Sequence, residues 1–251
     1  MDVKYYKEYS KYLNRDMEFK VYGNTGQPIL YFPCQDGRFY DCENFGMIDT
    51  VKDFIEEGKI QIFCCDSIDR ESWSANDKNH RERILAHEAW YNYIVNELAP
   101  RIFQINYELD KNHYINGIFT AGCSLGASHA ANFLFRNPDI FKATIGLSGY
   151  YDSNLFFGDY CDDLVHINAP VKYLDKMSYD HPYVEKYRNC KIILCCGQGA
   201  WEGPAIETTT RMRELLSYKD IPALVDLWGY DVNHDWPWWK IQFRYFLEKL
   251  L

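Results

Sequence analysis

The chain alternates short apolar runs with longer stretches that carry hydrophobic residues at helical spacing. This order is typical of a mostly parallel sheet with helices on both faces, an α/β fold. We expect strands at residues 29–32, 60–65, 115–121, 143–147, 192–196 and 223–228. We expect helices at residues 48–57, 81–106, 127–136, 204–218 and 236–250. Pro100 should kink the helix at 81–106, because proline lacks an N–H and crowds the preceding turn.

Two regions depart from this alternation. Residues 3–9 and 17–22 alternate apolar and polar side chains around a turn at residues 14–15. They predict an antiparallel N-terminal hairpin at a sheet edge. Residues 150–190 have no sustained pattern and predict an irregular insertion with short helical pieces. The chain has no internal repeat or Gly/Ser-rich linker, which favours a single domain over residues 1–251.

Composition and charge restrict the function classes. The net charge of −9 argues against nucleic acid and anionic membrane surfaces as partners. No apolar run is long enough to span a membrane, and the first residues lack the apolar segment of a signal peptide. The nine cysteines are odd in number, include no C-x-x-C pair and lie mostly in apolar runs. We therefore expect a cytoplasmic protein with reduced, buried thiols and neither disulfides nor zinc.

Residues 122–126 read Gly-Cys-Ser-Leu-Gly, a G-x-S-x-G pattern between a predicted strand and a predicted helix. Strand, sharp turn and helix form the context of a nucleophile elbow, in which the turn exposes the serine hydroxyl. Ser124 is accordingly our candidate nucleophile. A glycine-rich strand–helix turn without catalytic function is the alternative interpretation of the bare pattern.

A serine hydroxyl needs a base. His234 is the histidine that follows a late strand and precedes the closing helix, the place of the base in the order Ser, acid, His. The other histidines lie on predicted helices or in predicted surface loops: His80, His87, His129, His113, His166 and His181. We therefore expect His234 to activate Ser124.

The triad acid should follow the strand at 192–196. Glu202 is the one carboxylate in the loop at 197–204 and is our first choice. Glu207, in the next helical turn, is the rival, and Glu202 could instead be a helix N-terminal carboxylate favoured by the dipole. Three aspartates are weaker candidates because they lie in a strand or flank the histidine: Asp226, Asp231 and Asp235.

Acyl transfer also requires hydrogen-bond donors for an oxyanion. The backbone N–H of Leu125, next to the nucleophile, should be one of them. The loop that begins at Pro33 should supply the other, and proline itself has no N–H. Gln35 is the first choice there and Cys34 the second.

These segments together resemble the putative esterase family of α/β-hydrolases, which includes esterase D, feruloyl esterases and mycolyltransferases. The likeness rests on the serine motif, Gly197–Glu202, and His234-Asp-Trp followed by a Trp-bearing helix, with support from Ser148-Gly149-Tyr150. It implies an α/β-hydrolase fold, a serine acyl-enzyme and no metal or cofactor. Two departures concern the site: Pro33-Cys34 replaces the family's His-Gly, and the acid is Glu rather than Asp.

Aromatic residues make up 17% of the chain, and several fall in loops at the expected active edge. Trp73, Tyr150, Trp201 and Trp236 are the expected substrate contacts, with Tyr151 beside them, although loop aromatics often only cover a core. The sequence thus predicts a serine carboxylesterase for small acyl esters, including acylated sugars. An acyltransferase using the same acyl-enzyme, or an inactive hydrolase-like binding protein, are the alternatives. A homo-oligomer is possible on this sequence.

Overall fold

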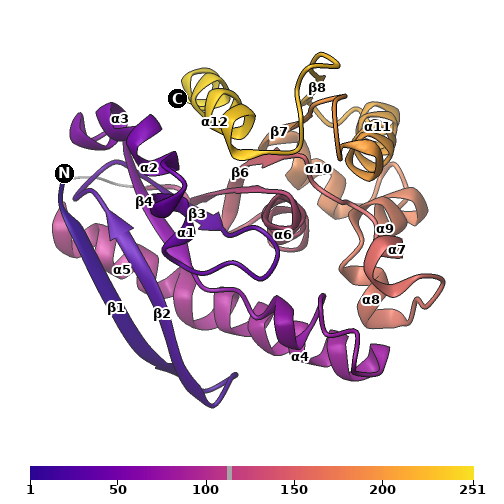
Figure 1. Ribbon diagram of the computed structural model, residues 1–251, viewed down its shortest axis with the longest axis horizontal. Coiled ribbons are helices and arrows are strands. Elements are labelled where there is room, and N and C mark those ends of the chain that lie inside the picture. Colours follow the sequence, from indigo (N-terminus) through magenta and orange to yellow (C-terminus); the bar gives the residue numbers. More distant parts are fainter. Residues whose placement is uncertain (112–114) are drawn as a thin grey trace. The chain divides into compact units, whose positions relative to one another are not determined.

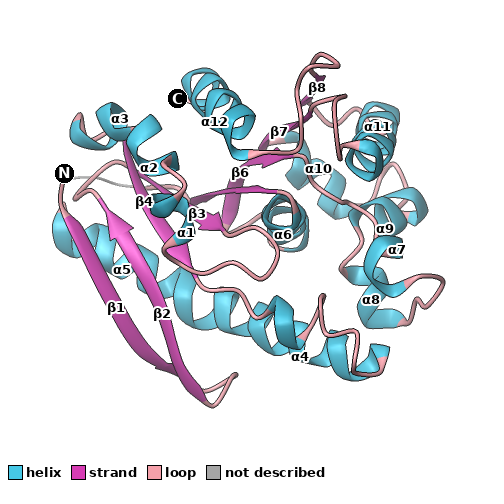
Figure 2. Cartoon of the chain, in the orientation of Figure 1, coloured by secondary structure: helices cyan, strands magenta, loops and turns pink. Residues whose placement is uncertain are grey.

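The computed structural model describes residues 1–111 and 115–251 of the chain. The chain divides into two compact units, Met1–Phe119 and Thr120–Leu251. In each unit, strands alternate with helices along the chain (Figures 1 and 2). This division does not decide the single-domain prediction, which stays a prediction.

The first unit begins with the predicted antiparallel hairpin. Strand β1 (Val3–Ser10) pairs with β2 (Arg15–Tyr22) in a register that runs from Val3 opposite Tyr22 to Ser10 opposite Arg15. Strand β2 is in turn antiparallel to β4 (Ile60–Cys65), and β4 is parallel to β3 (Gln27–Phe32). The order in this unit is therefore β1-β2-β4-β3, and the predicted hairpin and the first two parallel strands are confirmed.

Burial in this unit follows the side-chain patterns. The residues of β1 alternate between exposed and half-buried positions, as expected for an edge strand with one solvated face. All six residues of β4 are buried, including the polar Gln61, whose side-chain amide donates to the carbonyl oxygen of Gly23 at 3.1 Å. Full burial of an aliphatic or aromatic side chain such as Ile62 or Phe63 stabilises the fold by about 1.5–3 kcal/mol.

The helices of the first unit differ in detail from the prediction. The expected helix at 48–57 is split at Val51, where φ is −117°, into α2 (Met47–Thr50) and α3 (Lys52–Glu56). The expected loops after β3 and β4 contain short helical turns, α1 (Asp41–Asn44) and η1 (Asp69–Glu71).

The long helix runs from α4 (His80–Tyr93) through a π-helical segment η2 (Ile94–Leu98) to α5 (Ala99–Leu109). Pro100 stands in the first turn of α5, directly after the π segment. A proline ring crowds the carbonyl group four residues earlier, and a π turn widens the helix at that point. The irregularity expected at Pro100 is therefore present as a π-helical segment.

The second unit carries the strand order β5-β6-β7-β8. Strand β5 (Ile118–Cys123) starts three residues later than predicted and runs on through the first half of the serine motif. Strands β6 (Phe141–Leu147), β7 (Lys191–Cys196) and β8 (Ala223–Leu227) pair in parallel and lie where the apolar runs predict them.

The helices of this unit also follow the predicted pattern. They are α6 (Leu125–Arg136), α11 (Gly203–Tyr218) and α12 (Trp236–Leu250). The expected insertion at 150–190 consists of loops and four short helices: α7 (Asn154–Phe157), α8 (Asp163–Ile167), α9 (Pro170–Lys176) and α10 (Pro182–Arg188). Parallel strands end at one edge, so the segments after β5, β6, β7 and β8 converge there.

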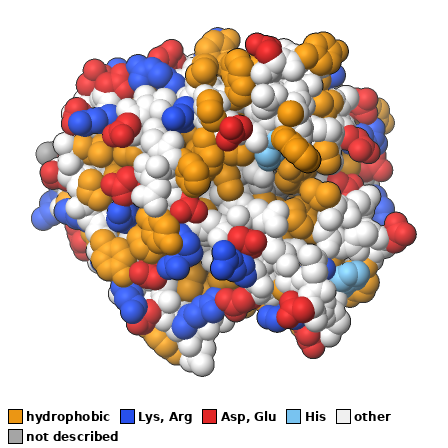
Figure 3. All heavy atoms as spheres, in the orientation of Figure 1, with side chains coloured by type: hydrophobic (Ala, Val, Ile, Leu, Met, Phe, Trp, Pro, Cys, Tyr) orange, Lys and Arg blue, Asp and Glu red, His pale blue; other side chains and the backbone are white. Residues whose placement is uncertain are grey.

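The surface is mixed in charge. On the face shown in Figure 3, acidic and basic side chains are interspersed with hydrophobic ones. Exposed ion pairs such as Arg188–Glu185 and Arg211–Glu214 contribute little stability, about 0–1 kcal/mol each. None of the described helices combines the length and apolar character needed to cross a membrane.

Candidate active site

Ser124 links β5 to α6 in a backbone conformation that residues other than glycine rarely adopt. Its φ and ψ are 56° and −129°. Its N–H donates to the carbonyl oxygen of Leu147 at 2.8 Å, which keeps the turn attached to β6. The strand therefore ends and the helix begins at one strained residue, the geometry expected of a nucleophile elbow.

The sequence around Ser124 makes this turn possible. A Cβ on Gly122 would lie 2.4 Å from the backbone of Gly126, so strand and helix approach too closely for a side chain at position 122. Cys123 and Leu125 are fully buried, whereas Ser124 is partly exposed. The motif thus presents the serine and buries its neighbours, including the thiol.

Ser124, His234 and Glu202 form one continuous hydrogen-bonded chain in the second unit. The Oγ atom of Ser124 lies 2.9 Å from Nε2 of His234. The Nδ1 atom of the same imidazole lies 3.0 Å from Oε2 of Glu202. With the proton on Nδ1, the imidazole donates to the carboxylate and leaves Nε2 free to accept from the serine, as a general base requires.

Glu202 is completely buried, and its second oxygen is also occupied. Oε1 accepts hydrogen bonds from the hydroxyl of Ser148 at 2.6 Å and from the N–H of Gly197 at 3.1 Å. The Nε1–H group of Trp239 donates to Ser148 at 2.9 Å, and the Trp239 ring meets His234 edge to face, with ring centroids 4.9 Å apart. The carboxylate is therefore held from both sides.

Backbone hydrogen bonds join the loop that carries Glu202 to the loop that carries His234. The N–H of His234 donates to the carbonyl oxygen of Ala200 at 3.0 Å, and the N–H of Gly199 donates to that of Val232 at 2.9 Å. A Cβ on Gly197 would meet the carbonyl oxygen of Val232 at 2.0 Å. Glycine is thus needed in this loop for close contact between the two backbones.

The competing carboxylates have other surroundings. Glu207 is exposed on α11, and Asp226 accepts from the indole N–H of Trp228 at 3.1 Å. Asp231 is exposed, and Asp235 caps the first N–H of α12 at 2.7 Å. Glu202 directly precedes α11 but makes no side-chain cap, so its carboxylate is directed to His234 and Ser148 instead.

The family model described as "Putative esterase" matches residues 10–250 of the chain. The chain belongs to this family. It is therefore a carboxylic ester hydrolase, and the family resemblance in the sequence is confirmed.

Solved structures similar to this esterase agree on the fold. A ferulic acid esterase is 15% identical, with a TM-score of 0.73 over 98% of this chain and 96% of that chain. An S-formylglutathione hydrolase from Staphylococcus aureus is 16% identical, with a TM-score of 0.70 over 99% and 96%. One from Agrobacterium tumefaciens is 12% identical, with a TM-score of 0.74 over 98% and 93%. The predicted α/β-hydrolase fold is confirmed. The search of curated proteins found no match.

The aromatic residues expected at the substrate have different environments in this esterase. Tyr150 contacts His234 directly, with its hydroxyl 3.3 Å from Nε2. Trp236 packs edge to face on Trp239 at 5.5 Å, and Trp201 is 85% exposed in the loop before Glu202. These positions keep Tyr150, Trp201 and Trp236 as candidates for contact with a substrate.

Two of the aromatics are core residues. Trp73 is buried in the first unit, where its indole N–H donates to Nδ1 of His87 at 2.9 Å. The ring therefore packs from its loop against α4, and contact of Trp73 with a substrate stays a prediction. Tyr151 is fully buried in the second unit, and burial raises the pKa of its hydroxyl well above the usual value.

The two predicted oxyanion donors lie in different units. Leu125 is the first residue of α6, where a backbone N–H has no partner within the helix. Gln35 is exposed in the first unit, and its N–H makes no hydrogen bond among the residues that the structure describes. Cys34 is half-buried, and its carbonyl oxygen accepts from the N–H of Gly37 at 2.9 Å.

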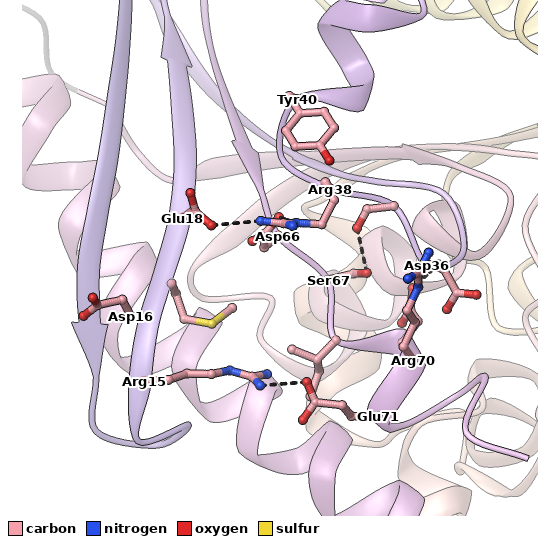
Figure 4. Close-up of a pocket in the computed structure, with 14 residues that line it drawn as sticks. Arg15, Asp16, Glu18, Asp36, Arg38, Tyr40, Asp66, Ser67, Arg70 and Glu71 are labelled. Atoms are coloured by element: carbon pink, nitrogen blue, oxygen red, sulfur yellow. Dashed lines mark hydrogen bonds and ion pairs between the residues drawn. The ribbon is translucent and has the colours of Figure 1, made fainter. Parts of the chain in front are cut away.

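A charged pocket of about 400 Å³ in the first unit was not anticipated from the sequence (Figure 4). Arg38 bridges Asp66 and Glu18, at 2.8 Å to each carboxylate, and Arg15 pairs with Glu71 at 2.7 Å. Burial raises the pKa of the Asp66 carboxyl, and the hydrogen bond from Arg38 opposes this shift. The pocket's own carboxylates thus neutralise both of these guanidinium groups.

The other histidines that the structure describes lie on helices or at a helix start. Those on the long helix and the elbow helix are where they were expected, whereas two expected in loops belong to short helices: His166 in α8 and His181 at the start of α10. His113 lies outside the described residues. Sequence reasoning missed the contact between Ser148 and Glu202, although Ser148-Gly149-Tyr150 had marked the segment.

Proposed function

We propose that this esterase is a serine carboxylesterase in which Ser124 is the nucleophile, His234 the base and Glu202 the acid. The observation that carries the proposal is the unbroken series of contacts from Oγ through both imidazole nitrogens to the buried carboxylate. Both distances lie in the range over which a serine proton can be transferred and an imidazole held.

The reaction would proceed in two steps. His234 Nε2 takes the Ser124 proton as Oγ bonds to the ester carbon, and the carbonyl electron pair moves to oxygen. As the tetrahedral intermediate collapses, the bond to the alcohol oxygen breaks, and that oxygen gains a proton from Nε2. Water then repeats the sequence on the acyl-enzyme and releases the acid. Glu202 would stabilise the imidazolium formed in each step and fix its tautomer.

The N–H of Leu125 would stabilise the oxyanion, because it stands at the N-terminus of α6 beside the nucleophile. Gln35 would be the second donor, with Cys34 as the alternative. A donor of this kind contributes about 3–4 kcal/mol to the transition state. The proposed reaction uses no metal or cofactor, so EDTA should leave activity unchanged.

Small acyl esters are the proposed substrates, and acylated sugars are a subset of them. Feruloyl esters and S-formylglutathione are two more specific candidates, because one similar structure is a ferulic acid esterase and two are S-formylglutathione hydrolases. The ring of Tyr150, which stacks on His234, and that of Trp236, which packs on Trp239, would contact a flat or apolar part of the ester.

A substrate panel with product analysis tests the proposal. It should contain p-nitrophenyl esters of increasing acyl length, acetylated and feruloylated sugars, and S-formylglutathione. Hydrolysis that Ser124→Ala abolishes is the expected result. Transfer of the acyl group to an added alcohol in preference to water would identify an acyltransferase. Ester binding without turnover would identify an inactive hydrolase-like binding protein.

A further inference from the structure

Strand β1 forms the edge of the sheet in the first unit. It pairs with β2 on one side and with no other strand among the residues that the structure describes, and it lies outside β2 in Figure 1. Its eight residues lie in continuous register with β2, and the strand contains neither a bulge nor a proline. Proteins commonly shorten, bulge or interrupt such edges, which prevents pairing with another chain. The remaining protection of β1 is its charged side chains.

The backbone groups on the open side of β1 belong to its odd-numbered residues. The N–H of Gly23 donates to the carbonyl oxygen of Asp2 at 2.9 Å, and these two residues continue the register of β1 and β2 by one pair. Opposite residues of an antiparallel pair are hydrogen-bonded at every second position, so the even-numbered residues of β1 bond to β2. The N–H of Asp66 donates to the carbonyl oxygen of Glu18, so the even-numbered residues of β2 are used by β4, which agrees. The outward N–H and C=O groups are those of Val3, Tyr5, Lys7 and Tyr9.

The odd-numbered side chains also leave apolar surface beside this edge. Val3, Tyr5 and Tyr9 lie on one face of the strand and are 46%, 52% and 60% exposed. A further strand placed along β1 would cover part of each of them. The open edge therefore offers both hydrogen-bonding groups and apolar contact.

The even-numbered side chains carry the charges that select a partner. Arg101 of α5 lies over the Tyr6 ring and pairs with Oε1 of Glu8 at 3.0 Å. Lys4 lies on the same face and has no ionic partner among the described residues. A partner strand that brings a carboxylate to Lys4 and an ammonium group to Glu8 would complement this face.

A second copy of β1 meets this requirement in one register. Outward backbone groups must lie opposite each other, so odd-numbered residues must face odd-numbered residues and an antiparallel pair must be centred on one residue. With the centre at Tyr6, Lys4 lies opposite Glu8 twice, in non-hydrogen-bonded pairs whose side chains approach most closely. The hydrogen-bonded pairs are then Val3 with Tyr9 and Tyr5 with Lys7.

The neighbouring registers place like charges opposite each other. A centre at Lys4, Lys7 or Glu8 puts that residue opposite its own copy. A centre at Tyr5 puts Asp2 opposite Glu8. Like charges directly opposite are destabilising, so the charges of β1 exclude these registers and favour the one centred on Tyr6.

We propose that two copies of this esterase form a dimer through antiparallel pairing of their β1 strands, centred on Tyr6. The two sheets continue into one another across a two-fold axis. The same surface is used by both copies, so the dimer closes and leaves neither β1 edge open.

Sedimentation velocity over a concentration series measures the Kd of the dimer. The wild-type protein should sediment as a dimer and dissociate on dilution. Lys4→Glu places two carboxylates opposite each other in both pairs, and we expect it to raise Kd at least about tenfold. Lys78→Glu makes the same charge change at an exposed residue outside β1 and should leave Kd unchanged. A wild type that is monomeric at every concentration would leave this edge to a strand of another protein and overturn the dimer, as would an unchanged Kd in Lys4→Glu.

A mixture of two variants tests the pairing of Lys4 with Glu8 directly. Glu8→Lys alone should also be mainly monomeric, because two lysines then face each other and the pair with Arg101 is lost. An equimolar mixture of Lys4→Glu and Glu8→Lys should form a heterodimer, since each pair again joins opposite charges. Thermal melts check that both variants are folded. A mixture that stays monomeric would rule out this register.

Proline at position 7 tests the hydrogen bonds of the edge without relying on charge. Lys7→Pro removes an outward N–H and no bond to β2, a position at which edge strands accept proline. Lys7→Ala keeps the N–H and is the matched control. We expect Lys7→Pro to be monomeric with unchanged esterase activity and Lys7→Ala to remain dimeric. A dimer that persists in Lys7→Pro would assign the interface to another surface.

Discussion

The hydroxyl of Ser148 lies 2.6 Å from Oε1 of Glu202, and Oε2 of the same carboxylate lies 3.0 Å from His234. Ser148 has a φ of 56° and follows β6, so a second strained serine stands one strand away from Ser124. Trp239 donates to this hydroxyl and also contacts the His234 ring. The acid and the base are thus positioned by shared neighbours.

Removal of the Ser148 hydroxyl should slow turnover. In Ser148→Ala, Glu202 keeps the N–H of Gly197 as a partner for Oε1 but loses its shorter hydrogen bond. We expect kcat to fall about tenfold, the scale seen when a hydrogen-bond partner of a functional residue is removed. The free energy of unfolding should fall by about 1–3 kcal/mol, because a buried polar atom loses its partner. Steady-state kinetics and urea unfolding measure the two effects.

Thr144→Val is the control for this variant. Thr144 is buried on the same strand, and its hydroxyl has no partner among the described residues, so valine should leave kcat unchanged. Trp239→Phe removes the indole N–H and keeps a ring against His234, and its defect should be smaller than that of Ser148→Ala. A full wild-type kcat in Ser148→Ala would show that Gly197 alone positions the acid.

The choice between Glu202 and Glu207 gives a second prediction. A triad acid holds the imidazole tautomer and stabilises the imidazolium, and its loss costs up to about 10⁴-fold. Glu202→Gln should therefore lower kcat at least about 10²-fold. Glu207→Gln should have little effect, since its carboxylate is exposed on α11 and is not hydrogen-bonded to His234.

Thermal melts on both variants, and on Asp226→Asn and Asp231→Asn, separate kinetic losses from unfolding. A larger defect in Glu207→Gln at an unchanged Tm would assign the acid to the helix.

The sequence predicted most elements because each carries a local signal. The hairpin, the parallel strands and the helices after β5, β7 and β8 follow side-chain periodicity and the positions of Gly and Pro. The break at Val51 was missed, because it lies inside a stretch whose periodicity is helical throughout. The irregularity near Pro100 was expected from the proline, but its π-helical form was not.

The candidate site was also predicted only in part from the sequence. Ser124 and His234 could be chosen because their order and their flanking elements are visible in the chain. The Ser148–Glu202 contact joins residues 54 positions apart and depends on how β6 and β7 align. Trp73 lies in the loop where it was expected, but a loop position does not reveal that its indole N–H donates to His87 on α4.

The nucleophile gives a third prediction. A fluorophosphonate probe should add one equivalent, on the peptide that contains Ser124, and Ser124→Ala should abolish both labelling and ester hydrolysis. Cys123→Ala is the matched control, because the thiol next to the serine is fully buried and should not take part. Labelling that persists in Ser124→Ala would assign the nucleophile elsewhere.

The cysteines give the last prediction. Seven of the nine are buried, Cys34 is half-buried and Cys161 is exposed. Burial raises the pKa of Cys196 to about 12 and raises the pKa of Cys195 and Cys190 as well. The thiolate is the reactive form. A disulfide reagent at neutral pH should therefore modify Cys161 fast and Cys34 slowly, and the others only after unfolding.

The same pKa shifts set a pH dependence of stability. A thiol ionises near pH 8.5 in the unfolded chain but at higher pH when it is buried, so the folded state holds its proton more tightly. This contribution to stability is present in full below about pH 8.5 and is lost as the pH rises toward the folded value. The urea midpoint should thus decline from pH 8.5 to 10, and the midpoint of Cys196→Ala should decline less over the same range.

The thiol variants check the modification experiment. The fast phase of modification should disappear in Cys161→Ser and persist in Cys195→Ser. Rapid reaction of a buried thiol in the folded protein would contradict the packing of β7.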